Sequence, residues 1–503
     1  MMTFDIHFDR RLNNFPVDLG FPTDVVSPVP YDSLILCGTL DGGVYLISMD
    51  GIRRRVFQMP ESSYTIPAVY DVNSDGIKEI ITGDTGGNLY ILEPDSTVLD
   101  SFKFRRIVGS PLVVDMDGDG HAEIVIGSDD SKIHIIHTLN DSIIDVYLGQ
   151  WIWTVPLFVN GYIYVVSDDG TLFKLTPDGK IVWRRGEESL TFTTSSPVAC
   201  DIDRDGKVEI IYSAGRRVVY CIDEDGNREW EYSIPERTFF SSPAIGDVNG
   251  DGWPEFVFAS GKKIYALDKN GFPLNGFPVD MRFSEEIQSS IILYDVDGDS
   301  MPEIIFGSPD GGIYGLKGDG KIHRYFPLTT GMRVYSTPYL FEKNDSLILM
   351  STSDDGYLYG WYLGQNPSGG FNYPQIYLNP QHNAFVDISL IPQPASGSIT
   401  SISSLIPERE FYIYPSPVNG TKGTLRYFVG DDVSGLIVNL KIFSVSGRRI
   451  FTRTDVNPGY GYHEYNIDFF RYGDGIYIAQ LVAEWNGEKI VLNKRFGVLK
   501  GGY

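Results

Sequence analysis

The stretch DIDRDGKVEIIYS, residues 201–213, joins an acidic turn to an apolar run, and its acidic part recurs along the chain. Oxygen-bearing side chains stand at positions 1, 3, 5 and 9 of its first nine residues, with glycine at position 6. The recurring stretches are DVNSDGIKE (71–79), DMDGDGHAE (115–123), DIDRDGKVE (201–209), DVNGDGWPE (247–255) and DVDGDSMPE (295–303), here called loops 1 to 5. This spacing supplies the oxygen ligands that a hard divalent cation such as calcium requires.

The separation of the loops reveals a longer repeat. Their first aspartates are 44, 86, 46 and 48 residues apart, and 86 is two periods of 43. Each unit contains four short runs suited to strands, of which the first three are apolar and the fourth is amphipathic. The first runs open at Pro28, Pro67, Pro111, Pro156, Pro197, Pro243 and Pro338, and Ile291 takes the place of an eighth proline. Four strands in a unit of this length are typical of a β-propeller blade.

The repeat therefore predicts an all-β fold with an eight-bladed propeller over residues 1–380, and seven blades with a divergent terminal unit as the alternative. Glycine and proline occur too often for helical periodicity to persist. The segment NFPVDL (14–19) resembles NGFPVDM (275–281), which falls at an outermost strand. We therefore expect the N-terminal segment to add a strand to the last blade and to close the ring.

The predicted ligands follow from the geometry of a nine-residue turn between two strands. Side chains at positions 1, 3 and 5 face one side, glycine at position 6 permits positive φ, and the carbonyl of position 7 turns inward. The glutamate at position 9 then closes the site. The predicted metal ligands are Asp71, Asn73, Asp75, Ile77, Glu79, Asp115, Asp117, Asp119, His121, Glu123, Asp201, Asp203, Asp205, Lys207, Glu209, Asp247, Asn249, Asp251, Trp253, Glu255, Asp295, Asp297, Asp299, Met301 and Glu303, those at position 7 through their carbonyls.

About five calcium ions are expected, one for each loop. An EF-hand would place its last glutamate at position 12, whereas here a strand follows position 9 at once. Ser300 replaces the glycine of loop 5, so we expect that site to be the weakest or the most distorted. The alternative is a set of hairpin turns without metal, because aspartate, asparagine and glycine favour turns for their own reasons.

These motifs resemble the FG-GAP or VCBS repeats of integrin-α-like propellers. The resemblance rests on Ser-Ser-Pro followed by an apolar run, the acidic loop, and a third run such as KIYAL (263–267), and it covers about 360 residues. In that family the acidic loops bind calcium, so the resemblance implies the same role here. The closing runs of the units are equally similar to repeats of eight-bladed quinoprotein propellers, whereas integrin-type propellers have seven blades.

A second domain is predicted after the repeat ends. The repeat is absent from residues 381–409, which are richer in serine and proline than the units before them. This composition predicts a linker. Residues 410–503 alternate apolar positions (Val438, Leu440, Ile442 and Phe443) and carry turn signals at 446–447 and 486–487. This pattern predicts an immunoglobulin-like β-sandwich of seven strands.

The second domain is similar to the C-terminal sorting domains of the type IX secretion system, which are FlgD-like. The matching pieces are YPSP (414–417), VSGR (445–448), GIY (475–477) and the basic strand that ends at Lys500. The resemblance implies a signal for export and anchoring that secretion machinery reads. An ordinary accessory sandwich is the alternative.

The composition limits the partners. A net charge of −25 argues against nucleic acid and anionic lipid as partners, because phosphate binding needs clustered basic residues. No apolar run reaches 18 residues, so no membrane insertion is predicted. The first fifteen residues contain no apolar signal segment, so an exported form would be trimmed or would have its true start elsewhere. The cysteines Cys37, Cys200 and Cys221 are predicted to be small buried hydrophobes.

The sequence predicts a secreted or surface-displayed bacterial protein that binds a glycan or a protein. No catalytic residue is predicted, and none of the seven histidines has the setting of a metal ligand. An extracellular polysaccharide lyase or hydrolase, which would show a deep axial cleft, is one alternative, and a structural subunit of a surface layer or filament is another. Candidates for ligand contact are Trp151, Trp153, Phe239, Phe240 and Tyr335.

Overall fold

The structure is a computed structural model that describes residues 10–186, 195–214, 217–235, 241–365, 372–391, 402–406, 411–414, 418–419, 421–429, 433–459 and 461–499. The chain divides into two compact units, Met1–Pro394 and Ala395–Tyr503. Helix within the described residues is limited to η1 (Ile388–Leu390) and α1 (Ile402–Leu405). None of the helices in the described ranges is long and apolar enough to cross a membrane.

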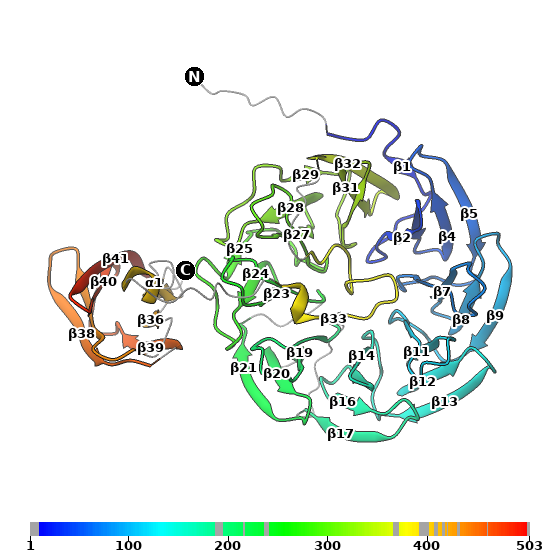
Figure 1. Ribbon diagram of the computed structural model, residues 1–503. Helices are drawn as coiled ribbons and strands as arrows, with labels where there is room; N and C mark the ends of the chain where they lie inside the picture. Colours follow the sequence, from blue (N-terminus) through cyan, green and yellow to red (C-terminus); the bar gives the residue numbers. More distant parts are fainter. Residues whose placement is uncertain are drawn as a thin grey trace. The chain divides into compact units, whose positions relative to one another are not determined.

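The described residues of the first unit form a ring of eight sheets, antiparallel except for one short pair described below (Figure 1). In seven of them, four successive strands run in order from the axis to the periphery, as the repeat predicts. The first four of these sheets contain β2 (Val29–Tyr31), β3 (Leu34–Gly38), β4 (Gly43–Ile47) and β5 (Arg53–Gln58); β6 (Ala68–Tyr70), β7 (Glu79–Gly83), β8 (Asn88–Leu92) and β9 (Val98–Lys103); β10 (Leu112–Val114), β11 (Glu123–Gly127), β12 (Lys132–His137) and β13 (Ser142–Tyr147); and β14 (Leu157–Val159), β15 (Tyr162–Val166), β16 (Leu172–Leu175) and β17 (Ile181–Arg185).

The next three sheets have the same strand order. They contain β18 (Val198–Cys200), β19 (Glu209–Ala214), β20 (Val218–Asp223) and β21 (Arg228–Ser233); β22 (Ala244–Gly246), β23 (Glu255–Ser260), β24 (Lys263–Leu267) and β25 (Val279–Asp280); and β26 (Ile292–Tyr294), β27 (Glu303–Gly307), β28 (Gly312–Leu316) and β29 (Leu328–Thr329). Cys37, Cys200 and Cys221 are buried on these strands as free thiols, which confirms their prediction.

Burial falls from the axis outward, and this gradient explains the composition of the four runs. Every residue of β7 is buried, because both faces of a second strand pack against neighbouring sheets. The outermost strand β9 has exposed residues alternating with half-buried ones. The amphipathic fourth run of each unit is therefore the strand that faces solvent on the rim of the ring.

The eighth sheet joins the two ends of the ring. Its inner strands are β30 (Tyr339–Lys343), β31 (Ser346–Ser353) and β32 (Tyr357–Gln365), and its outermost strand is the N-terminal β1 (Val17–Asp18). Val17 pairs with Leu358 in antiparallel register, and the Leu19 amide donates to the Gly356 carbonyl at 2.8 Å. This confirms that the N-terminal segment completes the last sheet.

Hydroxyl groups link neighbouring sheets around the axis. The residue before the opening proline, or before Ile291, donates its backbone N–H to the hydroxyl of its counterpart in the next sheet. The described bonds run from Ile66 to Ser110 (2.8 Å), Val155 to Ser196 (2.9 Å), Ser196 to Ser242 (3.3 Å), Ser242 to Ser290 (2.9 Å), Ser290 to Thr337 (3.1 Å) and Thr337 to Ser27 (2.8 Å). The last of these joins the eighth sheet to the first. The serine or threonine before most opening residues therefore has a structural role.

Residues 372–391 cross the centre of the ring and belong to the first unit (Figure 1). Tyr373 exchanges backbone hydrogen bonds with Leu293 of β26 at 2.7 and 3.0 Å. Further along, the carbonyls of Pro374, Pro380, Gln381 and Ala384 accept from the innermost strands β30, β6, β10 and β18. The strand β33 (Phe385–Val386) pairs in parallel with β18. The segment therefore satisfies backbone donors that face the axis.

This finding corrects the predicted linker over residues 381–409 at both ends. His382 and Val386 are at most 1% exposed within the first unit. Ile402 and Leu405 of α1 are buried in the core of the second unit. Residues 381–391 thus belong to the first unit, where they bond the edges of inner strands, and residues 402–406 belong to the second.

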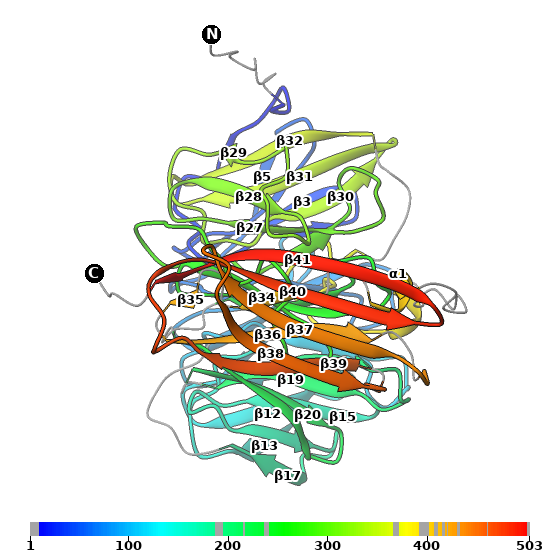
Figure 2. The ribbon, with the colours of Figure 1, turned by 90° about the vertical axis from the view of Figure 1, so that its left-hand side faces the viewer.

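The second unit consists of two sheets that share one hydrophobic core. One has the order β34 (Tyr412–Tyr414), β36 (Lys422–Val429) and β39 (Gly461–Asp468), and the other β35 (Val418–Asn419), β41 (Glu488–Leu499), β40 (Gly475–Trp485), β37 (Ile437–Ser444) and β38 (Arg449–Val456). Figure 2 shows the long paired strands β40 and β41. The described part of this unit contains eight strands where the sequence predicts seven, because the short β35 pairs in parallel with β41.

The predicted alternation in the second unit reflects burial. Val438, Leu440 and Ile442 are fully buried, whereas Phe443 is half-buried. The Asn486–Gly487 turn has positive φ at both residues (50° and 79°), as a two-residue hairpin of this type requires, and it connects β40 to β41.

Leu19→Ala tests the closure of the ring. Leu19 is fully buried beside β1, so its truncation should lower the free energy of unfolding by about 2–5 kcal/mol. Phe21→Ala is the matched control, because this side chain is 52% exposed and its loss should cost less than about 0.5 kcal/mol. Thermal and denaturant melts of the full chain measure both. Equal small effects would mean that the N-terminal segment contributes little to closure.

Candidate metal centres

The five acidic loops occupy equivalent places in the ring. Each connects the innermost strand of a sheet to its second strand, as loop 1 connects β6 to β7. The glutamate at position 9 is in every case the first residue of the second strand (β7, β11, β19, β23 and β27). The prediction that a strand begins there is confirmed, and it places the glutamate carboxylate at the buried base of the loop.

A common set of hydrogen bonds folds each loop around its acidic side chains. In loop 3, Asp201 accepts from the Gly206 amide at 3.1 Å, and Asp205 accepts from the Lys207 amide at 2.8 Å. Glu209 accepts from the Ile202 amide at 2.8 Å. The same bonds, from positions 6, 7 and 2 to positions 1, 5 and 9, occur in the other four loops. One oxygen of each of these carboxylates therefore shapes the loop.

The backbone conformation confirms one prediction and adds another constraint. Position 6 has positive φ in all five loops, including Ser300 at 69°, so the absence of glycine in loop 5 leaves strained backbone. Position 4 also has positive φ throughout, with Ser74 at 60° and Arg204 at 63°. The predicted ligand spacing does not account for this second corner. Glycine at position 4 of the other three loops, at 118, 250 and 298, was the available signal.

The loops bring predicted ligands together. Candidate ligand atoms lie within 4.8 Å of one another in the sets Asp71, Asp75 and Glu79; Asp115, Asp117 and Asp119; and Asp201, Asp203 and Glu209. The carbonyls at position 7, in Ile77, His121, Lys207, Trp253 and Met301, stay predicted ligands. Three side chains in each set are few for calcium, which takes six to eight oxygens, so the carbonyl and water would complete the shell.

Two buried glutamates have an oxygen without a partner, and both face these sets. Glu79 is 0% and Glu209 1% exposed, and their Oε1 atoms lack any hydrogen-bond partner. Burial raises the pKa of Glu79 to about 7 and that of Glu209 to about 8, and neighbouring carboxylates add to both shifts. A buried carboxylate without a counter-charge is costly. Loops 1 and 3 therefore fit a bound divalent cation, which would supply that charge.

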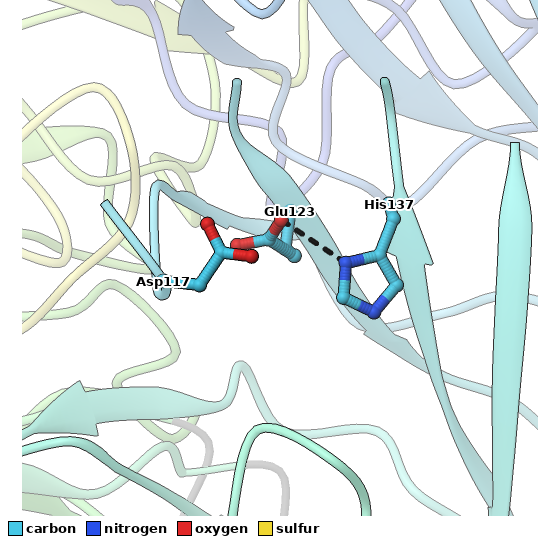
Figure 3. Close-up of side chains that lie close together, drawn as sticks. All are labelled: Asp117, Glu123 and His137. Atoms are coloured by element: carbon cyan, nitrogen blue, oxygen red, sulfur yellow. Dashed lines mark hydrogen bonds and ion pairs between the residues drawn. The ribbon is translucent and has the colours of Figure 1, made fainter. Parts of the chain in front are cut away.

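A histidine that is not among the predicted ligands lies beside loop 2. His137 lies on β12, and its Nδ1 is 3.2 Å from Glu123 Oε1, with Asp117 beside them (Figure 3). The prediction that no histidine has a metal setting is therefore wrong for this residue. Register explains the miss, because Glu123 and His137 are directly opposite each other on paired strands. His134, three residues earlier, instead hydrogen-bonds Asp145 and Ser128.

Loop 5 already contains a cation. The Lys317 Nζ lies 3.0 Å from both Asp297 and Asp299 and 3.9 Å from Glu303. Burial opposes its charge, but the hydrogen bonds to the two aspartates raise the pKa of Lys317 above its usual value. His323, the second correction to the histidine prediction, has Nε2 3.1 Å from Asp297. The ammonium therefore stands among the predicted ligands of loop 5.

Loop 4 satisfies its glutamate internally. The Asn249 amide donates to Glu255 Oε1 at 2.8 Å, while the Val248 amide donates to the other oxygen at 2.9 Å. Burial and the charges of Asp251 and Asp247 nevertheless raise the pKa of Glu255 well above its usual value. An ion in loop 4 would therefore relieve charge repulsion rather than supply a missing partner.

Neighbouring loops also contact one another. The Ser74 hydroxyl of loop 1 donates to the Gly120 carbonyl of loop 2, and Arg204 of loop 3 donates to the Gly252 carbonyl of loop 4 at 3.0 Å. Both bonds run from position 4 of one loop to position 6 of the next. The loops therefore form linked pairs on one face of the ring, and an ion that orders one loop would also support its neighbour.

Comparison with known proteins supports the repeat. Residues 201–258, from loop 3 to β23, match the FG-GAP-like repeat family. Three solved structures share the fold of the first unit: BamB from Moraxella catarrhalis (14% identity, TM-score 0.50, 68% of this chain and 99% of that chain), quinohemoprotein alcohol dehydrogenase from Comamonas testosteroni (12%, 0.51, 71% and 77%) and Sqt1 from Saccharomyces cerevisiae (13%, 0.52, 69% and 97%).

The first unit is a β-propeller. The low identities of these structures show the fold alone. Lambda-carrageenases from Pseudoalteromonas sp and Pseudoalteromonas carrageenovora are 30% identical over 111 residues. That match covers 22% of this chain and 11% of each carrageenase.

Glu209→Gln tests the buried charge of loop 3. In chelator the variant should be more stable than the wild type at neutral pH, because it lacks a buried carboxylate whose folded-state pKa is about 8 against an ordinary 4.5. Because the folded state binds this proton more tightly than the unfolded state, protonation stabilises the protein at low pH. That contribution is lost as the pH rises through the folded-state pKa. Melting temperatures of the wild type in chelator should therefore fall between about pH 5 and about pH 8, with a flatter profile for the variant.

The exposed Glu61→Gln is the matched control for this experiment and should leave the profile unchanged. Identical profiles for Glu209→Gln and the wild type would contradict the assigned pKa.

Proposed function

We propose that this chain is a calcium-binding, eight-bladed β-propeller, secreted or displayed at the cell surface, that binds a glycan or a protein. The single observation that carries the calcium proposal is the pair of buried glutamates, Glu79 and Glu209, each with an unpartnered oxygen facing an acidic cluster. The FG-GAP-like match over residues 201–258 supports it. The ions would hold the loops that join the first two strands of a sheet, so their role would be structural.

Four ions are more consistent with the geometry than the five expected from the sequence. Lys317 supplies a positive charge among the carboxylates of loop 5, so a divalent ion would have to displace it. Lys269 also interacts electrostatically with Asp203 of loop 3 and Asp251 of loop 4, but burial lowers its pKa, whereas the pKa of Lys317 is raised. The strained backbone at Ser300 also agrees with the prediction that the metal site of loop 5 is the weakest or the most distorted.

For the second unit we propose an immunoglobulin-like sandwich that serves in type IX export and anchoring. Its two sheets around one core and its Gly475-Ile476-Tyr477 segment at the start of β40 support this proposal. Secretion machinery would be its partner. No nucleic acid is expected as a partner of either unit, since the net charge is −25.

A polysaccharide-active enzyme is the second candidate function, and the similarity to lambda-carrageenases favours it. Two carboxylates near Trp153 could take part in acid–base chemistry. Burial raises the pKa of Asp168 to about 6, with contributions from Asp169 and Asp129. Asp129 itself accepts from the Trp153 indole at 2.6 Å and lies 3.7 Å from Arg106. Asp168 is buried beside other carboxylates, whereas Asp129 contacts the Trp153 indole and Arg106. Two carboxylates in such different environments can serve as acid and base.

Calcium titration of the full chain tests the first proposal. Calorimetry should show uptake of about four ions, and calcium at a hundredfold excess over Kd should stabilise the fold by about 2.7 kcal/mol for each site. Lys317→Met should add a further ion, whereas the exposed Lys321→Met should not. Absence of uptake by the wild type would contradict the calcium proposal, and an unchanged stoichiometry in Lys317→Met would contradict the role given to the lysine.

Incubation with λ-carrageenan and with neutral polysaccharides separates binding from catalysis. The binding proposal predicts retention on the polysaccharide without new reducing ends or unsaturated products. Product that is formed by the wild type and lost in Asp168→Asn, with an unchanged melting temperature, would instead favour the enzyme. Glu61→Gln serves again as the control.

A further inference from the structure

A small cavity opens on the axis of the propeller, at the end opposite to the acidic loops. It is lined by the residues that stand three before the proline, or Ile291, that opens the first run of each unit. The described ones are Val25, Tyr64, Val108, Trp153, Gln288 and Tyr335. We call this cavity the axial cup. Each innermost strand begins at the cup and ends at the face of the loops, so the two sites are separated by the length of these strands.

The floor of the cup is the segment that crosses the ring. Ile376 and Tyr377 line the cavity and are at most 9% exposed. The Tyr377 side chain contacts those of Ser196 and Ser242 in the ring of hydroxyls. The cavity has a volume of about 160 Å³. A cavity of this size accommodates a single six-membered ring. An axial channel without a floor would not limit the ligand to one ring.

Carboxylates fix the aromatic walls of the cup. The Trp153 indole donates to Asp129 at 2.6 Å, and the Tyr335 hydroxyl donates to Glu285 at 2.7 Å. Trp151, 42% exposed, stacks on Trp153 with ring centroids 5.4 Å apart. These bonds hold the aromatic faces before any ligand arrives, which lowers the entropy that binding must overcome. Trp151, Trp153 and Tyr335, the aromatic candidates from the sequence, thus gather at one site, whereas Phe239 and Phe240 lie outside the described residues.

Two arginines at the rim form ion pairs with carboxylates. Arg333 lies 3.1 Å from Asp354 and 3.5 Å from Glu285, and Arg106 lies 3.7 Å from Asp129. An anionic ligand would have to compete with these carboxylates, in a protein whose net charge is −25. The chemistry of the cup therefore favours an uncharged ligand that combines apolar faces with hydroxyl groups.

We propose that the axial cup binds one uncharged pyranose residue of a glycan. The C–H face of the sugar packs on Trp153 and Tyr335, and the Gln288 amide offers a donor and an acceptor to hydroxyl groups. This inference rests on the proposed function, since it assigns the glycan-binding site of the propeller. It also gives the segment 372–391 a second role, because that segment closes the site from below.

Titration of the full chain with glucose, galactose, mannose and their neutral oligosaccharides tests the proposal. A single pyranose in such a site should bind with a Kd of about 1 mM, measured by calorimetry or by saturation-transfer NMR. Trp153→Ala removes the principal platform and should weaken binding at least tenfold. Val108→Trp, on the wall, fills the cup without removing a contact and should abolish binding.

Trp183→Ala is the matched control, because this tryptophan lies on the outermost strand β17 (Figure 1) and should leave binding unchanged. Thermal melts establish that each variant is folded. Sugar binding that is lost in Trp153→Ala and in folded Val108→Trp supports the cup.

Binding that persists in both folded variants overturns the cup while leaving a glycan-binding propeller in place. No binding to any neutral sugar, or binding to sulfated sugars alone, also overturns the cup. Calcium uptake, measured separately, tests the calcium part of the proposed function, and retention on polysaccharide tests the binding part.

Discussion

The backbone donors and acceptors around the axis impose the constraint on which the propeller depends. The innermost strand of each sheet is an edge, and a closed ring turns these edges inward, where unpaired amides are costly. Two devices satisfy them. Hydroxyls such as Ser110 and Thr337 bond neighbouring sheets to one another, and the segment 372–391 bonds the edges of inner strands directly. Closure by β1 then joins the two ends of the chain's first unit.

The innermost strands also connect the two faces of the ring. An innermost strand starts at the axial cup and ends at a loop whose glutamate, such as Glu209, accepts from the backbone two residues into the loop. Because that glutamate also begins the second strand, an ion bound to it would hold two strands of one sheet together. The proposed calcium sites would therefore stabilise the scaffold, while the opposite face remains free for ligand contact.

The loops also illustrate how nearly identical sequences acquire different sites. Glu79 and Glu209 each have an oxygen without a partner, whereas Glu123 faces His137, and Glu255 is satisfied by Asn249. In loop 5 a lysine that directly follows β28 lies among the carboxylates. Neither the histidine nor the lysine belongs to the nine-residue motif. Their positions follow from strand register, which brings residues 14 apart into contact with the base of a loop.

The sequence by itself determined the local features of this protein: the all-β class, the repeat of four strands, the positive φ at position 6, and the N-terminal strand that completes the last sheet. These depend on residue spacing, on glycine and on short apolar runs, all of which act over a few neighbouring residues. Only the tertiary structure decided that residues 381–391 cross the axis, that Lys317 enters loop 5, and that Tyr64, Trp153 and Tyr335 share one cup. The axis-crossing segment and the cup join residues from different sheets, and the closure of the ring sets their proximity. Lys317 reaches loop 5 within one sheet, through the pairing of β27 with β28. No local pattern encodes either kind of contact.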